Sequence, residues 1–359
     1  MHNPLSYHRL PVYCLKLASA TRDFRLNFRT IAVAAIISLS CLISVRVSQL
    51  MGLSFSFWAG YACIRVYNNC RSITLERSVM RVAGTVAALI IVIMLASWIH
   101  SRFFMFTLIL AIVAFAFYLA CHRRHASYFY IMFAITVLLF LHPFITSSSH
   151  EGVETVYART VETLLGSLIM LVLIYPLLKK SRKAFHHPKT QPQIKQNLLF
   201  TATFIILVIV AFIATLPLKQ VIYFEQAVIG IIAVMCGFEE IQIKHLSILR
   251  FSGCFIGILF AATAIILHLG GFEIWLFSFF SLLLFALIVQ QSKDIAYLGA
   301  QAVLCYLTTT YATIDNSSIS HGIERLTSTF ITLMCIFSIY GLFLLFRKIT
   351  KQKFRLEEC

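Results

Sequence analysis

The chain has 359 residues, of which 60% are hydrophobic and only 12% are charged. Because soluble proteins are usually about 25% charged, this composition excludes an ordinary soluble domain and predicts an integral membrane protein. The net charge of +16 comes from basic residues in short segments between apolar runs, which argues against nucleic-acid binding.

The first segment, residues 1–27, mixes aromatic, aliphatic and basic side chains. It lacks the uninterrupted apolar core and the small-residue cleavage site of a signal peptide. We expect a cytoplasmic segment that lies on the membrane surface, with lipid as its partner.

Twelve apolar stretches follow, and a helix needs about 20 apolar residues to cross the hydrocarbon. The sequence therefore predicts an all-α membrane protein with about twelve transmembrane helices and no sizeable soluble domain. The expected spans are 28–47, 52–68, 80–99, 103–121, 126–145, 158–178, 198–217, 221–238, 250–268, 272–290, 294–313 and 325–346.

The two halves of the chain repeat a short motif. Arg81-x-x-Gly84 recurs 169 residues later as Arg250-x-x-Gly253. This recurrence predicts two membrane repeats, 28–178 and 198–346. Because each repeat has an even number of helices, the two run parallel. The remaining segments are a cytoplasmic linker at 179–197 and a cytoplasmic tail at 347–359.

Positive charge concentrates on one side of the expected spans. With the amino terminus inside, all but five of the 30 Lys and Arg residues fall in cytoplasmic segments. Membrane proteins carry this excess in their cytoplasmic loops, so we expect both termini in the cytoplasm.

The second span of each half is short, polar and interrupted by glycine. Such segments at matching places in two halves are typical of transporter binding sites. Trp58 offers a ring face to a substrate in the first half. Glu225 is the candidate proton-coupling residue in the second, because an apolar site favours the neutral carboxyl. The alternatives are close helix packing at the glycines and a position of Glu225 at the outer headgroup level.

Arg46 lies near the outer end of the first span and has no acidic residue within four positions, which favours a role in anion binding. Snorkelling to the interface is the alternative. Arg81 and Arg250 are expected at the cytoplasmic entrance of the third helix of each half. Their repeated motif is interpreted as more architectural than catalytic, with the substrate contacts expected mainly where the halves differ. Both arginines are still expected, with Arg46, Arg159 and Arg325, to supply positive potential along the substrate path.

Arg159 and Arg325 open the last span of each half, 166 residues apart. At the outer ends of these helices they can receive an anion. Alternatively, they pair with the nearby carboxylates of Glu162 and Glu324 and fix the helices.

The fifth span of the second half is rich in hydroxyl groups and rings. Tyr297, Gln301 and Thr308 recur at helical spacing and are expected to share one face, with Tyr311 further along the same span. This face suits the lining of a path for a small aromatic or polar solute. Hydrogen bonding to neighbouring helices is the alternative.

Other chemistry leaves no pattern in the sequence. The ten cysteines form no C-x-x-C pair, and no phosphate-binding G-x-x-x-x-G-K-[ST] loop is present. We therefore expect no metal, no cofactor and no catalytic residues, and a transporter rather than an enzyme.

Three motifs together resemble a known family. Phe57-Trp58-Ala59, Arg81-x-x-Gly84-Thr85 and Arg159-x-x-Glu162-Thr163-x-x-Gly166 look like those of the fusaric acid resistance and aromatic acid exporter family. In the second half, Arg250-x-x-Gly253 and Gly322-Ile-Glu-Arg325 resemble its second membrane unit.

The resemblance implies an exporter of small carboxylated aromatic compounds in the bacterial inner membrane, often driven by ion gradients. Members sometimes work with a periplasmic adaptor, and a homo-oligomer is a further expected partner. Related plant proteins are anion channels, so a channel is the alternative, and a non-transporting membrane scaffold is a third. The chain departs from the family in its short linker. Its second half also has Cys254 at the position that matches Thr85 of the first half, and Thr332 at the position that matches Gly166.

Overall fold

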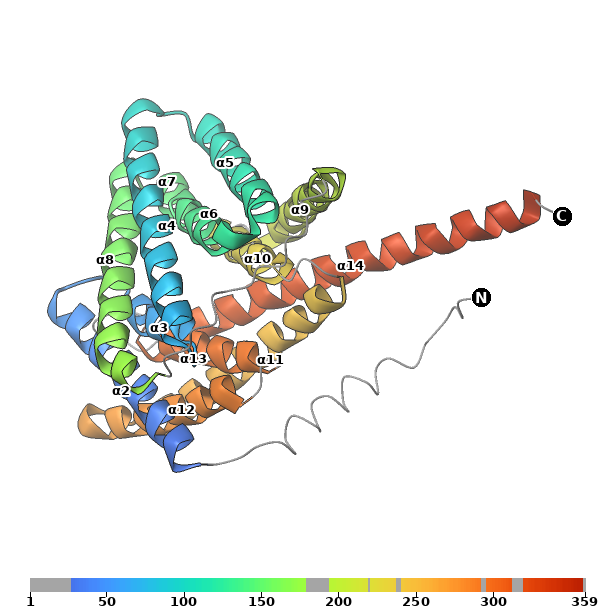
Figure 1. Cartoon of the computed structure of the whole chain (residues 1–359). Helices are drawn as coiled ribbons and strands as arrows, with labels where there is room; N and C mark the ends of the chain where they lie inside the picture. The colour runs from blue at the N-terminus through green and yellow to red at the C-terminus, as the bar shows by residue number, and fades with distance from the viewer. Residues whose placement is uncertain are drawn as a thin grey trace.

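The computed structural model describes residues 27–178, 194–218, 220–236, 240–291, 295–311 and 319–357. The predicted surface segment and most of the linker lie outside these residues. Within the described residues the regular structure is helical, as predicted (Figure 1). The main helices are α2 (Phe28–Leu50), α3 (Phe57–Val66), α4 (Arg71–Trp98), α5 (Arg102–His122), α6 (Ser127–Leu138), α7 (Leu141–Thr146), α8 (Ser149–Ile174), α9 (Ile194–Thr215), α10 (Val221–Met235), α11 (Glu240–Ile266), α12 (Gly271–Gln291), α13 (Ala296–Thr310) and α14 (Ile319–Glu357).

Nine helical segments of the described chain are long and apolar enough to cross a membrane, with α6 and α7 counted as one. Their outer faces carry large exposed apolar side chains such as Trp98, Phe103 and Phe272. Exposure of these apolar surfaces to water would cost free energy, whereas contact with lipid would not. The protein is a multi-pass membrane protein.

The prediction of twelve full spans is wrong for three elements. The helices α3, α10 and α13 have 10, 15 and 15 residues, too few to cross the hydrocarbon alone. The expected span at 126–145 is broken between α6 and α7. The last helix is longer than expected and runs through the predicted tail to Glu357.

The short helices can end inside the membrane because protein surrounds them. Nine of the ten residues of α3 and twelve of the fifteen residues of α13 are buried. Figure 1 shows α3 and α13 near the centre of the assembly, with long helices around them. Non-helical backbone at membrane depth is tolerated where protein encloses it or where it lines a cavity.

The two halves of the chain use matching pairs of helices. In the first half, α3 packs on α2 and α8, and α4 packs on α6 and α8. In the second half, α10 packs on α9 and α14, and α11 packs on α13 and α14. The contacts between the halves also match. The contact of α3 with α13 corresponds to that of α10 with α6. The contact of α2 with α12 corresponds to that of α9 with α5.

The glycine of each Arg-x-x-Gly motif lies where two backbones approach closely. A Cβ atom on Gly84 would lie 2.6 Å from the carbonyl oxygen of Phe129, and one on Gly253 would lie 2.5 Å from that of Leu298. These two positions join α4 to α6 and α11 to α13, so glycine at each is a packing requirement.

Candidate functional site

Trp58 lies at the centre of the molecule between two arginines. The sequence begins α3 after a turn through Gly52, whose φ of +71° suits glycine, and this short helix presents Trp58 inward. The Arg159 guanidinium, from α8, lies 3.8 Å from the centre of its ring, and the Arg325 guanidinium, from α14, lies 5.4 Å away. Both contacts are within the range of a cation–π interaction.

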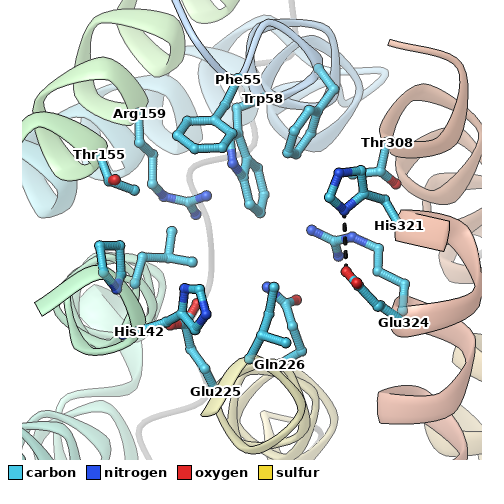
Figure 2. Close-up of a pocket in the computed structure, with 15 residues that line it drawn as sticks. Phe55, Trp58, His142, Thr155, Arg159, Glu225, Gln226, Thr308, His321 and Glu324 are labelled. Atoms are coloured by element: carbon cyan, nitrogen blue, oxygen red, sulfur yellow. Dashed lines mark hydrogen bonds and ion pairs between the residues drawn. The ribbon is translucent and has the colours of Figure 1, made fainter. Parts of the chain in front are cut away.

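A cavity of about 310 Å³ opens on one side of Trp58, and we call it the vestibule (Figure 2). Figure 2 shows Arg159, Phe55 and Trp58 along one wall, with Glu225 and His142 opposite. The vestibule is lined by Phe55, Phe57, Trp58, Leu139, His142, Pro143, Thr155, Arg159, Ile222, Glu225, Gln226, Thr308, His321, Glu324 and Arg325.

The carboxylates of the vestibule have their own hydrogen-bond donors. The Glu225 side chain is buried, and its Oε2 accepts a hydrogen bond of 3.1 Å from the backbone N–H of His142, at the start of α7. The Nδ1 of His321 and the Oε2 of Glu324 lie 3.2 Å apart. Glu225 is therefore buried within the protein.

A second cavity, of about 100 Å³, also borders Trp58, and we call it the arginine cavity. It shares Trp58, Arg159 and Arg325 with the vestibule. Its ionic lining within the described chain consists of five arginines and no carboxylate. These arginines are Arg65, Arg81, Arg159, Arg250 and Arg325.

The repeated arginines hold matching positions in the arginine cavity. The Nη1 of Arg81 donates to the Tyr128 hydroxyl at 3.2 Å, and the Nη1 of Arg250 donates to the Tyr297 hydroxyl at 3.3 Å. Each tyrosine follows its arginine by 47 residues. The Arg81 guanidinium also lies 5.6 Å from the centre of the Tyr61 ring.

Arg81 and Arg250, two of the predicted substrate-binding residues, lie at the space between the halves. Both side chains are buried, with 1% and 4% exposed, and both line the arginine cavity. The glycines of the repeated motif allow close helix packing, while the arginines face the space between the halves. The residues that the halves share, and not only those that differ, therefore line the candidate site.

The expected pairing of Arg159 with Glu162 is absent from the described ion pairs. Instead, the Oε1 of Glu162 accepts from the backbone N–H of Phe55 at 3.1 Å and from the Ser48 hydroxyl at 3.4 Å. The alternative partner of Arg325, Glu324, contacts His321. Glu162 therefore contacts the turn before α3, and Glu324 contacts His321. Arg159 and Arg325 lie against the ring of Trp58 instead.

Eight of the predicted site residues line one or both cavities: Trp58, Arg81, Arg159, Glu225, Arg250, Tyr297, Gln301 and Arg325. Two lie elsewhere. Arg46 is exposed in a shallow groove of α2 and α12 beside Ile43 and Trp275, as its snorkelling alternative requires. Tyr311 is absent from the lining of both cavities, and its hydroxyl contacts that of Ser278 at 2.8 Å.

Sequence reasoning missed four lining groups in particular: Arg65, His142, His321 and Glu324. Arg65 ends the polar second span, which was a usable signal because the span had already been singled out. The two histidines gave no signal, since each lies beside a loop at a helix start. Within the described chain, no cluster of His, Cys, Asp and Glu could hold a metal ion.

A comparison with protein families supports the resemblance seen in the sequence. The family described as fusaric acid resistance protein-like matches residues 41–173, just over a third of the chain. The predicted family resemblance is confirmed. The matched region contains Trp58, Arg81 and Arg159, and it ends before Glu225 and Arg250. No curated protein matches the chain, and no solved structure does.

Proposed function

We propose that this protein transports a small organic anion, an aromatic carboxylate, out of the cytoplasm across the inner membrane. The observation that carries the proposal is the position of Trp58, between the guanidinium groups of Arg159 and Arg325 and at the meeting point of two cavities. The likeness to fusaric acid resistance proteins supports it.

The vestibule suits an aromatic acid in size and chemistry. Its volume of about 310 Å³ is at the lower end of small-molecule pockets. Phe55, Phe57 and Leu139 provide an apolar wall for a ring. Arg159 and Arg325 provide planar N–H donors that match a carboxylate.

The two arginines come from different halves of the chain, so the substrate lies between the halves. The matching helix contacts support two parallel six-helix repeats. In transporters built from repeats, substrates bind at the repeat interface near the middle of the membrane. Rocking of one repeat against the other would then open the vestibule and the arginine cavity in turn.

Glu225 is the proposed proton carrier. It is buried beside the substrate position, and burial in an apolar site favours its neutral form. Arg159 and Arg325 face it across the vestibule, and the N–H of His142 donates to its carboxyl group.

Reconstituted vesicles test the proposal. Radiolabelled benzoate and substituted benzoates should cross the membrane of vesicles that contain the protein, faster with a pH gradient than without one. The Arg159→Gln variant should lose transport, while Arg46→Gln, which changes an arginine remote from both cavities, should retain it. Absence of transport of every acid in the panel, with and without a gradient, would contradict the proposal.

An anion channel is the second candidate, and the five arginines of the arginine cavity favour it. A chain of cationic groups through the membrane interior attracts anions and excludes cations. A channel predicts ohmic anion current in planar bilayers, with no dependence on a proton gradient. A carrier predicts no unitary current and saturable uptake.

A further inference from the structure

We propose that the arginine cavity is a separate binding site for a small monovalent inorganic anion of about the size of chloride. This site does not depend on the proposed transport of an organic acid. It rests on the charge, the free hydrogen-bond donors and the size of the cavity.

The charge of the cavity is unbalanced. Arg81, Arg159, Arg250 and Arg325 are at most 8% exposed, and Arg65 joins them in the lining. No carboxylate lines the cavity within the described chain. Charges buried without a counter-charge are costly, because little water remains to solvate them and like charges repel. An anion between the guanidinium groups reduces both costs.

The cavity also has donors that nothing in the protein accepts. The Nε of Arg81, the Nε of Arg250 and the Nη1 of Arg159 are buried and have no hydrogen-bond partner. A buried donor without an acceptor costs about 1–3 kcal/mol, and more when it is charged. These three groups come from α4, α11 and α8, so both halves contribute donors without an acceptor to the lining of the cavity.

The tyrosines add two further donors. The hydroxyl oxygens of Tyr128 and Tyr297 accept from Arg81 and Arg250. Because a phenol both accepts and donates, the hydroxyl hydrogen of each tyrosine stays free to point at an anion. Two matching Arg–Tyr pairs thus face one space from the two halves.

The size and the walls of the cavity select the anion. About 100 Å³ is a third of the vestibule volume and holds an ion of a few atoms, but not an aromatic acid with its hydration. Ile131, Ile229 and Leu304 contribute apolar wall, and Gln301 adds a polar side chain to the lining. Such walls favour a weakly hydrated monovalent ion over sulfate or phosphate, whose desolvation costs more.

The first test measures stability against chloride. The full chain, purified in detergent with sodium gluconate, is titrated with sodium chloride at constant ionic strength. Gluconate is too large for the cavity, so the melting temperature should rise saturably as chloride replaces it. An unchanged melting temperature, or a larger rise with sulfate or phosphate, would overturn the proposal.

The second test uses variants and a direct binding measurement. Equilibrium dialysis with radioactive chloride should give one ion per chain, and Arg81→Gln and Arg250→Gln should each weaken binding at least tenfold. Each variant removes one repelling charge, so it should unfold at a higher temperature than the unchanged protein in gluconate. The rise in unfolding temperature distinguishes loss of the anion site from misfolding, which would lower that temperature. The matched control Arg46→Gln should keep full chloride binding, and equal weakening in the control would refute the site.

Discussion

Trp58 is the ring that lines both cavities, and the proposed function gives it the central role in binding. Its two neighbouring guanidinium groups approach from α8 and α14, so each half of the chain supplies one cation. An aromatic carboxylate can interact with the arginines through its carboxylate while its ring contacts the indole or Phe55. Without a substrate, the same arginines contact the ring of Trp58 directly.

Replacement of Trp58 tests this role. A buried cation–π contact contributes up to about 2 kcal/mol, and 1.4 kcal/mol corresponds to a factor of ten in binding. We expect Trp58→Leu to lower kcat/KM for the aromatic acid at least tenfold and Trp58→Phe to lower it less, in initial-rate measurements on vesicles. Trp98→Leu changes a tryptophan on the outer surface and should leave the rate unchanged. Equal rates for all four proteins would exclude Trp58 from the path.

Glu225 offers a second test at the scale of one residue. The Glu225→Gln variant keeps an oxygen that can accept from the His142 N–H, but it cannot carry a proton. We expect it to lose the acceleration by a pH gradient while it still exchanges labelled for unlabelled acid across the membrane. Transport by Glu273→Gln, at an exposed carboxylate at the start of α12, should still respond to the gradient. A normal gradient response in the Glu225 variant would assign coupling elsewhere.

At the scale of elements, the short helices build the site because longer helices hold them. The turn before α3 is anchored by Glu162 of α8, which accepts from the Phe55 N–H. Gly166 of α8 then allows α3 to approach, since a Cβ there would collide with the Ala59 carbonyl. In the second half, Thr332 of α14 occupies the matching position, and Gly230 of α10 supplies the missing space. The glycine lies on α8 in the first half and on α10 in the second, and both halves have a close contact between these helices and their partners.

The close approaches of α4 and α11 predict a stability effect. Gly84→Ala and Gly253→Ala would each force a Cβ against backbone, so we expect each to lower the free energy of unfolding by about 1–3 kcal/mol. Gly341→Ala makes the same change in α14 at a position with no atom within 4 Å, and there the better helix propensity should leave stability equal or higher. The three melting temperatures in detergent check this contrast. Equal losses at all three sites would rule out close packing as the reason.

At the scale of the whole molecule, the site lies between two sets of helices that pair in the same way. Arg81 and Arg159 come from the first set, Arg250 and Arg325 from the second, and all four face the shared cavity. This arrangement explains how a chain with few charged residues can place cations at its centre. Large exposed apolar side chains such as Trp98 and Phe103 lie on the long helices, while the buried charges lie where the two halves meet.

The orientation of the molecule gives a prediction at this scale. The excess of Lys and Arg predicts that both termini are cytoplasmic. A fluorescent protein fused after Cys359 should therefore fluoresce, and alkaline phosphatase inserted in the loop at 99–101 should be active outside the cytoplasm. Active phosphatase fused at the carboxyl terminus would reverse the assignment.

Composition and the length of the apolar stretches were enough to predict the long helices, because hydrocarbon requires long apolar segments whose backbone bonds internally. The position of Trp58 on a short polar element and the repeated Arg-x-x-Gly motif could also be recognised without coordinates. Only the tertiary structure decided which arginines act together: Arg65 lines a cavity, whereas Arg46 faces outward. The reason is physical. A sequence determines the length and the faces of each helix, but the burial of a charge and its partners depend on which other helices surround it, and those contacts join residues more than a hundred positions apart.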